Sequence, residues 1–406
     1  MTLRSCVAAM LTALVLIGAS SCARTTPESA PPIASESVSA TPSATASATP
    51  SPTASPEPSP TPTAGPLVVS TSQEAAIPAD PVEFTVENAT VVAATLKGAA
   101  GEVPGAYTEN RWTPNEPLQF NAEYTLTVTL DDGQTREATI RTVNPGPEAS
   151  FKVLYLFDGV GVGMPAYVKF DHPVGEAYRA EIEKHAFVTT EPAQEGSWGW
   201  LSDTELLWRP KEYWQPGTKV KLHFSWDGVQ ATDSTWLRKT LDADFSVSDV
   251  ARIIKVDIAD HTTTVVENGE VVNTLPSTTG KEGFTTRSGT KIILEKNDSR
   301  QMNSETINIP AGSREAYNLN VKYAMRVTWT GEFIHAAPWS VGSQGRENVS
   351  HGCVGLSTDN AGWLYGRSNV GDVVEFTGSD REMDPAEGIG VWMYTWEQWQ
   401  DRSALQ

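Results

Sequence analysis

Short runs of alternating apolar and polar residues fill the chain from Leu67 to about residue 147. Val82–Val86 and Tyr124–Leu130 show the period of two that places successive side chains on opposite faces of a strand. Turn-forming stretches such as Asp131-Asp132-Gly133 separate these runs, and nothing in this span competes with the period of a helix. Regular short strands between such turns are typical of a β-sandwich, so the pattern restricts this part of the fold to stacked antiparallel sheets.

The same pattern recurs after residue 147, for example at Ala166–Phe170 and Lys219–Phe224. A similar stretch of sequence occurs late in each of these two regions, at residues 120–126 and 215–222, which suggests a weak internal duplication. We therefore predict two tandem immunoglobulin-like β-sandwiches, residues 67–147 and residues 148–250, that act as spacers or as substrate-positioning modules.

Residues 1–21 have the composition of a signal peptide. Arg4 precedes an apolar core at residues 7–17, which is too short for a comfortable membrane span of about 20 residues. The small residues 18–21 followed by Cys22 resemble a bacterial lipobox, in which the cysteine becomes the lipidated first residue, although Ala19 stands where such boxes usually carry an aliphatic residue such as leucine. We expect an exported protein with a lipid at Cys22; the alternative is an ordinary secreted protein that is cut nearby.

Residues 22–66 consist mainly of Ser, Thr, Ala and Pro and cannot bury a core, so we expect a disordered linker there. Beyond this linker about 340 residues remain, which corresponds to two or three domains. The formal net charge of −20 argues against nucleic acid as a partner, because phosphate binding requires clustered Lys and Arg.

A third, mainly β domain is predicted at residues 251–378. Asn268-Gly269 accepts the positive φ angles of a tight turn and would join strands at 263–266 and 271–275, and a short helix is expected at about 359–367. The remaining segment, 379–406, carries tryptophans at the i, i+4, i+7 spacing of a helix face. We expect this stripe of Trp392, Trp396 and Trp399 to pack back on the third domain, without a cofactor role.

Cys353 is a candidate nucleophile because it has no disulfide partner. The chain has three cysteines. Cys6 lies inside the predicted signal peptide and Cys22 at its end, so a lone thiol remains in the folded part, where it is a candidate reactive group. A thiol near its ordinary pKa of about 8.5 is mostly protonated at neutral pH, so a nucleophilic cysteine needs a base or positive surroundings.

Two histidines are candidates for that base. His335 follows an apolar strand pattern and is well placed to face a second strand end carrying Cys353, whereas His351 in a strand or turn could point elsewhere. One cysteine with scattered histidines lacks the ligand spacing of a zinc site, so we predict no metal. We interpret the other four histidines as ordinary surface or packed residues: His172, His185, His223 and His261.

The motif around the cysteine resembles the signature of the L,D-transpeptidases with a YkuD-type catalytic domain. There a histidine is followed by a spacer and Ser/Thr-His-Gly-Cys; here fourteen residues separate His335 from Ser350-His351-Gly352-Cys353. The phrase at residues 334–345 is more narrowly similar to actinobacterial members, which are anchored lipoproteins with one or two immunoglobulin-like domains and a Trp-rich C-terminal segment. The resemblance covers essentially the whole mature chain and implies that residues 251–378 are the catalytic domain.

The resemblance implies acyl transfer through a cysteine, without a cofactor. Cys353 would attack the carbonyl before the terminal D-Ala of a peptidoglycan stem tetrapeptide, His335 would take its proton, and the Ala336 carbonyl would orient the imidazole ring. Backbone N–H groups of His351, Gly352 and Cys353 would form the oxyanion hole. Further positions match the substrate pocket or its lid in this family: Met302, Tyr317, Thr330, Gly331 and Trp339.

Residues beside the nucleophile carry further expectations. Ser350 and His351 would shape the loop and support the thiolate, and Gly352 would allow a tight backbone path. Gly355 departs from the family, in which many members carry Asn. If that Asn contributes a substrate hydrogen bond, Gly355→Asn should improve turnover or affinity; if Gly355 needs a positive φ angle, Asn should be tolerated better than Val.

The leading function is therefore 3→3 cross-linking of peptidoglycan, in which a thioester forms, D-Ala leaves, and the side-chain amine of a second stem's diaminopimelate resolves the thioester. Two alternatives stay open: water resolves the thioester, making an L,D-carboxypeptidase, or Gly355 marks a non-catalytic wall-binding lipoprotein. The resemblance further implies an extracytoplasmic protein, lipid-anchored to the membrane and facing the cell wall, with stem peptides as partners and carbapenem β-lactams as inhibitors.

Overall fold

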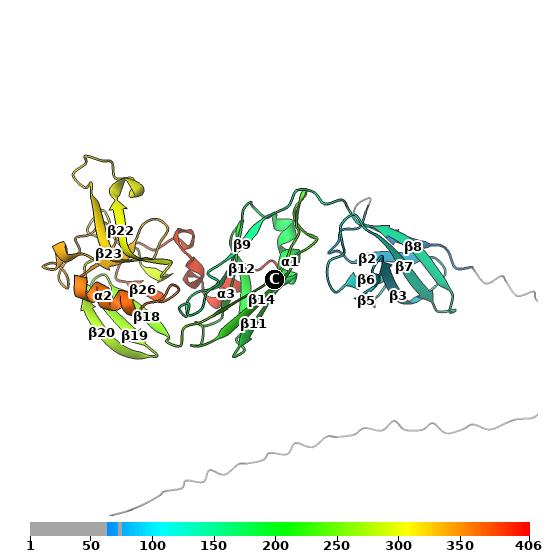
Figure 1. The fold of residues 1–406 in the computed structure, drawn as a ribbon, viewed down its shortest axis with the longest axis horizontal. Coiled ribbons are helices and arrows are strands. Elements are labelled where there is room, and N and C mark those ends of the chain that lie inside the picture. The colour runs from blue at the N-terminus through cyan, green and yellow to red at the C-terminus, as the bar shows by residue number, and fades with distance from the viewer. Residues whose placement is uncertain (1–62, 72–74) are drawn as a thin grey trace, which may run out of the picture. The chain divides into compact units, whose positions relative to one another are not determined.

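The computed structural model describes residues 63–71 and 75–406, and these form a mostly β structure (Figure 1). The predicted signal peptide, Cys22 and the linker up to residue 62 lie outside the described residues. Strands outnumber the α-helices in the described part, so the predicted fold class is confirmed. None of the helices described there is both long enough and apolar enough to cross a membrane.

The first sandwich consists of two four-stranded sheets, with the orders β1-β2-β6-β5 and β4-β3-β7-β8. Every second residue of β7 from Tyr124 to Leu130 is buried, as the alternating sequence predicts. These side chains meet Phe84 and Trp112 from the other sheet in one core. The strands are β1 Leu67–Ser70, β2 Val82–Val86, β3 Val91–Gly98, β4 Gly101–Val103, β5 Gly105–Thr108, β6 Arg111–Pro114, β7 Glu123–Leu130 and β8 Thr135–Arg141.

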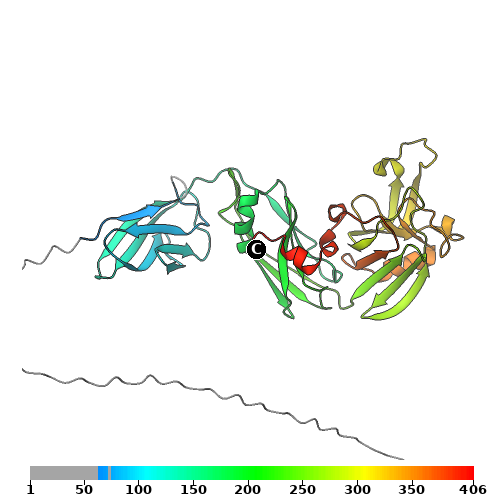
Figure 2. The same ribbon diagram turned by 180° about the vertical axis from the view of Figure 1, so that it is seen from behind.

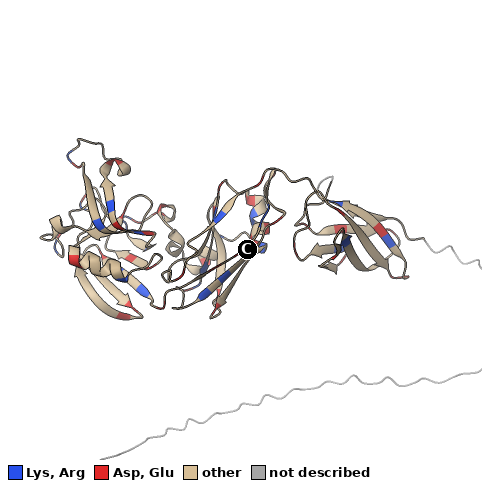
Figure 3. Cartoon of the chain, in the orientation of Figure 1, with Lys and Arg blue, Asp and Glu red and all other residues tan. Residues whose placement is uncertain are grey.

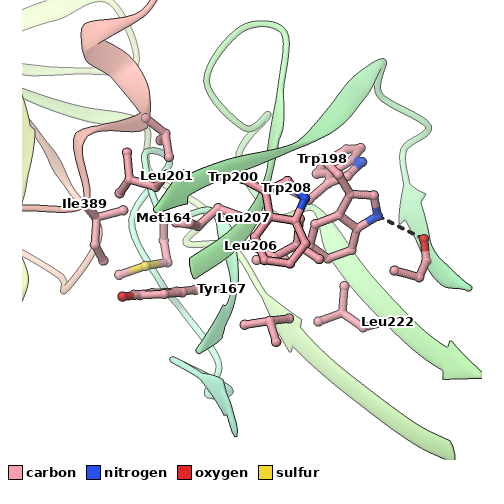
Figure 4. Packing of buried hydrophobic residues seen from close by; sticks show 14 of the residues in the cluster. Met164, Tyr167, Trp198, Trp200, Leu201, Leu206, Leu207, Trp208, Leu222 and Ile389 are labelled. Carbon is pink, nitrogen blue, oxygen red and sulfur yellow. Dashed lines mark hydrogen bonds between the residues drawn. The ribbon is translucent and has the colours of Figure 1, made fainter. Parts of the chain in front are cut away.

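The second sandwich has a four-stranded sheet, β12-β13-β10-β9, a three-stranded sheet, β11-β14-β17, and the pair β15-β16. Its core is rich in tryptophan, and Figure 4 shows Trp198, Trp200 and Trp208 among Leu206 and Leu207. The elements are β9 Phe151–Leu154, β10 Ala166–Phe170, α1 Glu176–Lys184, β11 Ala186–Glu191, β12 Gly196–Ser202, β13 Glu205–Pro210, β14 Lys219–Ser225, β15 Val229–Thr232, β16 Thr235–Leu237 and β17 Thr240–Ser246.

The third domain contains a five-stranded sheet, β20-β19-β18-β26-β21, and a four-stranded sheet, β22-β23-β24-β25. Apolar side chains of both sheets, such as Ile254 and Ile334, share one core. The elements are β18 Arg252–Asp257, β19 Thr262–Glu267, β20 Glu270–Pro276, β21 Gly289–Ile292, β22 Glu295–Asn303, η1 Ser304–Ile307, β23 Asn318–Arg326, β24 Phe333–Ala336, η2 Pro338–Ser340, β25 Val354–Leu356, α2 Thr358–Arg367 and β26 Val373–Thr377.

Two local predictions in this domain are confirmed. Asn268 and Gly269 have φ angles of 50° and 87° and turn the chain between β19 and β20. The predicted short helix is α2, whose first turn is capped by the Ser357 side chain accepting a hydrogen bond from the Asn360 N–H. Because α2 begins directly after β25, it fixes the strand that follows the candidate nucleophile.

The first part of the C-terminal segment packs on the third domain as predicted, since the N–H groups of Ser288 and Trp329 donate to the carbonyls of Arg381 and Glu387 at 2.7 and 2.6 Å. The segment's tryptophans do not pack there. They lie on two short helices, η4 Gly390–Met393 and α3 Trp396–Gln400, which follow η3 Pro385–Glu387. Although η4 contacts β21, α3 contacts β12 of the second sandwich, and the red C-terminal helix lies against green strands in both ribbon views (Figures 1 and 2).

Hydrogen bonds and packing explain why the tryptophans lie on the second sandwich. The indole N–H groups of Trp392 and Trp399 donate to the carbonyls of Gly163 and Ser197 in the second sandwich, at 2.7 and 3.1 Å. A Cβ at Gly199 would lie 2.8 Å from the Trp399 ring, so the glycine makes room for this indole. The second sandwich therefore supplies both the acceptors and the space that the third domain was expected to supply.

Charged residues are interspersed over the strands of all three folded parts, with Lys and Arg close to Asp and Glu (Figure 3). Cross-strand ion pairs such as Arg111–Glu83 and Arg141–Glu123 are exposed, so each contributes little to stability.

Candidate active site

Two parallel strands bring Cys353 and His335 to one cavity. β24 pairs with β25 so that Ile334 lies opposite Val354 and His335 opposite Gly355. Cys353 directly precedes β25 and lies two residues before Gly355. Since side chains two residues apart point to the same face of a sheet, we expect Cys353 and His335 to share a face. Both side chains line the same cavity.

This cavity has a volume of about 380 Å³, within the range of small-ligand sites. It brings together residues that lie far apart in the sequence. The lining comprises Thr278, Met302, Tyr317, Leu319, His335, Ala337, Trp339, Ser340, Ser343, Val349, Ser350, His351, Cys353 and Gly355.

The His335 ring is buried, and its pKa favours the neutral form. The residue is 6% exposed, and Nδ1 lies 2.9 Å from the Ala336 carbonyl oxygen. A carbonyl only accepts, so Nδ1 carries the proton and donates, which leaves Nε2 unprotonated in the neutral ring. Burial lowers the pKa of His335 below its ordinary value, so at neutral pH Nε2 is free to accept a proton.

Cys353 rests as a protonated thiol. Its exposure is 8%, and Sγ donates to the Gly331 carbonyl oxygen at 3.7 Å. Burial, with a smaller contribution from the Glu332 carboxylate, raises the pKa of Cys353 to about 12, although the Phe333 N–H and Lys291 act in the opposite direction. Because burial disfavours the thiolate, the thiol must lose its proton to a base when it attacks.

His351 faces the lid, which we define as residues 304–317 between β22 and β23. Its Nε2 lies 2.8 Å from Glu315 Oε2, and Lys281 Nζ lies 2.5 Å from the same oxygen. The Tyr317 and Phe284 rings pack on the imidazole, with centroids 5.1 and 4.6 Å away. These contacts commit His351 to holding the lid and leave His335 as the candidate base.

Tyr317 brings a phenol to the lining of the cavity. Burial, followed by the negative charge that Cys353 carries when it is ionised, raises the pKa of the Tyr317 phenol to about 12. Its hydroxyl therefore keeps its proton at neutral pH. Tyr317, which the family resemblance assigns to the substrate pocket or its lid, thus lies in the cavity of Cys353.

The loop before the nucleophile is fixed by its own hydrogen bonds. Ser350 Oγ donates to the Cys353 carbonyl oxygen at 2.6 Å and accepts from the Gly352 N–H at 3.1 Å, while Thr286 Oγ1 donates to the Gly352 carbonyl at 2.8 Å. Gly352 has a φ angle of 119°, which explains the glycine. The expectation that the Gly352 N–H joins the oxyanion hole needs correction, because Ser350 already accepts from it.

The other expected pocket residues divide between two cavities. Met302 and Trp339 line the cavity of Cys353, and the Trp339 ring is 61% exposed, with its centroid 6.0 Å from that of His335. Thr330 and Gly331 instead line a neighbouring cavity of about 300 Å³ together with His351 and Gly352. The sequence analysis assigned no role to six further lining residues, which the fold brings to the cavity: Thr278, Leu319, Ala337, Ser340, Ser343 and Val349.

Gly355 is required for close packing and not for a positive φ angle. It is absent from the glycines with positive φ. Its N–H and carbonyl pair with the backbone of Thr278 at 2.8 and 3.1 Å, and a Cβ would lie 2.9 Å from Thr278 Cγ2 and 3.0 Å from Ala337 Cβ. The positive-φ alternative is therefore wrong, and a side chain here meets Thr278 and Ala337 at close range.

We expect Gly355→Asn to lose activity and stability, because the inserted Cβ pushes Thr278 away from β25. Overpacking of this kind typically costs about 1–3 kcal/mol in the free energy of unfolding. Urea denaturation and acylation kinetics would measure both effects, and Gly355→Ala tests the Cβ alone. An asparagine variant that is as stable as wild type and turns over faster would contradict the packing argument and favour a substrate hydrogen bond.

The chain matches two known families and several known proteins in sequence. The bacterial Ig domain family matches residues 73–230, a range that runs across both sandwiches, and the L,D-transpeptidase catalytic domain family, YkuD, matches residues 251–376. L,D-transpeptidase 2 of Mycobacterium tuberculosis is 33% identical over 335 residues, which cover 80% of this chain and 81% of that protein. L,D-transpeptidase 1 of the same species is 39% identical over 219 residues, covering 54% of this chain and 80% of that protein.

A solved structure of an LD transpeptidase in complex with imipenem is 37% identical to this chain, with a TM-score of 0.49, and covers 57% of this chain and 100% of its own. The relationship itself rests on the matches in sequence, which extend over the sandwiches as well as the catalytic domain. The chain belongs to the L,D-transpeptidase family, whose members are acyltransferase-type enzymes.

Proposed function

We propose that this enzyme forms 3→3 cross-links between peptidoglycan stem peptides through a thioester on Cys353. The observation that carries the proposal is that Cys353 and His335 line one cavity, with the His335 ring bonded through Nδ1 to the Ala336 carbonyl. Nucleophile, base and orienting group are the three parts that covalent acyl transfer requires.

The first half of the reaction follows from the protonation states. Nε2 of His335 takes the thiol proton as Sγ bonds to the carbonyl carbon before the terminal D-Ala. The bond to the D-Ala nitrogen then breaks, and the leaving amine receives that proton from His335. In the second half, the diaminopimelate amine of another stem attacks the thioester, His335 accepts its proton, and the proton returns to the departing thiolate.

Hydrogen-bond donors around the carbonyl oxygen complete the proposed site. With the Gly352 N–H bonded to Ser350, the backbone N–H groups of His351 and Cys353 remain the candidate donors of the original three. The Tyr317 hydroxyl is a further candidate, since its raised pKa keeps it protonated. Removing one donor from such a hole typically costs about 10²- to 10³-fold in rate.

A purified disaccharide tetrapeptide tests the function. We expect mass spectrometry to find a dimer joined between the third residues of two stems, with one D-Ala released per bond. A tripeptide without dimer would identify water as the acceptor and an L,D-carboxypeptidase. Unchanged substrate with folded enzyme would favour the non-catalytic alternative.

We also expect a carbapenem to acylate Cys353, because its strained lactam presents an activated carbonyl to the thiol that stem peptides would meet. Intact-mass analysis should show addition of one inhibitor, and digestion should place it on the tryptic peptide of residues 347–367, which contains no other cysteine. An adduct on any other residue would overturn the assignment of the nucleophile.

We further propose that Cys22 carries a lipid and that the linker holds the enzyme outside the membrane, facing the cell wall. This proposal rests on the N-terminal sequence, in which a short apolar core and small residues precede Cys22.

A further inference from the structure

Four charged side chains form a buried cluster beside the nucleophile. Lys291 Nζ lies 2.6 Å from Glu332 Oε2, Arg287 Nη1 lies 3.1 Å from Glu332 Oε1, and Arg287 Nε lies 2.8 Å from Glu387 Oε2. The side chains of Lys291 and Glu332 are 0% and 6% exposed. Lys291 comes from β21, Glu332 directly precedes β24, and Glu387 lies in η3 of the C-terminal segment.

Glu332 stands between the two peptide groups that contact the sulfur of Cys353. The carbonyl of Gly331 belongs to the peptide before Glu332 and accepts from Sγ at 3.7 Å. The N–H of Phe333 belongs to the peptide after Glu332 and favours the thiolate, because it lowers the pKa of Cys353 against the effect of burial. A rotation of the backbone at Glu332 would therefore move both groups away from the nucleophile.

The side chain of Glu332 completes the restraint on this backbone. The Glu332 N–H donates to Thr328 Oγ1 at 2.9 Å, and its carbonyl accepts from the Val327 N–H at 3.0 Å. Gly331, with a φ angle of 106°, gives the chain freedom to turn directly before Glu332. The carboxylate counters that freedom, because Oε1 also accepts from the backbone N–H of Arg287 at 3.1 Å.

Stability alone is a weak reason for such a cluster. Desolvating a carboxylate and an ammonium offsets much of their attraction, so apolar residues of similar volume often serve a buried site equally well. Conformational specificity is the role for which buried ion pairs have been retained in some systems. Here the ion pairs specify the conformation of the backbone at residues 331–333, beside the sulfur of Cys353.

We propose that Glu332 is a positioning residue for acyl transfer: its ion pairs with Lys291 and Arg287 hold the two peptide groups that fix Sγ of Cys353. This inference rests on the proposed role of Cys353 as nucleophile. The cluster acts on the sulfur in two ways, through geometry and through charge, since the Glu332 carboxylate opposes the thiolate and the Lys291 ammonium favours it.

The test compares two reactions of Cys353 in the full-length protein. Acylation by the tetrapeptide requires correct geometry, whereas alkylation by iodoacetamide at fixed pH near 8.5 reports the thiolate fraction, mapped on the peptide of residues 347–367. We expect Glu332→Gln to acylate at least about tenfold more slowly, since small misplacements of reacting groups cost up to about 10²-fold. Its alkylation should be severalfold faster, because a negative charge has been removed.

Lys291→Met should be slower in both reactions, because a positive charge near the thiolate is lost, while Lys291→Arg should alkylate at the wild-type rate. Simple loosening of the site would instead speed alkylation in both charge-removing variants. The double variant Glu332→Gln/Lys291→Met removes both partners of the ion pair, so it buries no unpaired charge at this pair. It replaces Lys291→Met in the test if that single variant fails to fold. We expect the double variant to fold and to acylate slowly. Other ionisable groups facing Cys353 stay unchanged in all variants: His335, His351 and Tyr317.

Asp372→Asn is the matched control, because it breaks another buried pair, Arg252 Nη1–Asp372 Oδ2 at 2.9 Å, away from the cavity. Both rates for Cys353 should stay within about twofold of wild type. Folded Glu332→Gln with wild-type acylation, or faster alkylation in both Glu332→Gln and Lys291→Met, would overturn the proposal. If the wild-type enzyme accepts no acyl group at all, the proposed function fails. The alkylation rates would then still test whether the charges of Glu332 and Lys291 act on Cys353.

Discussion

Cys353→Ala is expected to abolish acylation by a stem tetrapeptide while the protein remains folded. The thiol is the proposed nucleophile, and alanine offers no atom that bonds to the carbonyl carbon. The sulfur packs in a small cluster with Val321, Ala324 and Phe333, so its removal should cost only about 1 kcal/mol in the free energy of unfolding. Intact-mass analysis after incubation with donor measures acylation, and urea denaturation measures stability.

Cys353→Ser provides the matched control, because the hydroxyl has nearly the size of the thiol but ionises far less readily. We expect it to fold like wild type and to acylate at a small fraction of the wild-type rate. Product formation by the alanine variant at a measurable fraction of the wild-type rate would refute the mechanism.

His335→Gln should slow acylation by at least about 10²-fold at neutral pH, because the thiol then has no base. The sign of the pH dependence follows from the two pKa shifts. Since the pKa of Cys353 is raised to about 12, the thiolate fraction in the variant rises with pH throughout the range from 7 to 10, and the deficit should shrink there. Since the pKa of His335 is lowered by burial, wild-type acylation should lose rate only below the ordinary histidine pKa of about 6.5.

His351→Ala is the natural comparison for this prediction. Its imidazole contacts Glu315 of the lid, so we expect weaker substrate binding and a smaller loss of rate than in His335→Gln. Rates of acylation across the pH range would distinguish the two histidines. If His351 proved indispensable and His335 dispensable at every pH, their roles would have to be exchanged.

Local patterns in the sequence predict those parts of the fold that local forces determine. Asn268-Gly269 specifies its turn through φ angles that few other residues adopt, and the alternation from Tyr124 to Leu130 specifies which face of β7 is buried. The tryptophans of the C-terminal segment are different. Their spacing predicts a buried stripe, but the choice between two domains depends on Gly163 and Ser197, whose carbonyls only the folded second sandwich presents.

The candidate site, too, can be predicted from the sequence only in part. The motif and the family resemblance predict Cys353 and His335, because chemistry restricts which residue types can act there. Ala336 is predicted only by its place after His335, since any residue supplies a backbone carbonyl. Gly355 illustrates what a motif leaves out: its packing against Thr278 depends on a bridge between distant segments. Glu332 is adjacent to strand β24 and carries no motif, and only the assembled fold shows its partners Lys291 and Arg287.

The acyl-enzyme itself offers the most direct test of the central claim. Wild-type protein incubated with a tetrapeptide donor and no acceptor, then quenched in acid, should gain the mass of the donor minus one D-Ala. Digestion should place this gain on residues 347–367, at Cys353, and the gain should be absent from Cys353→Ala. Cross-linked product formed without any adduct on that peptide, or an adduct that persists in Cys353→Ala, would contradict the account.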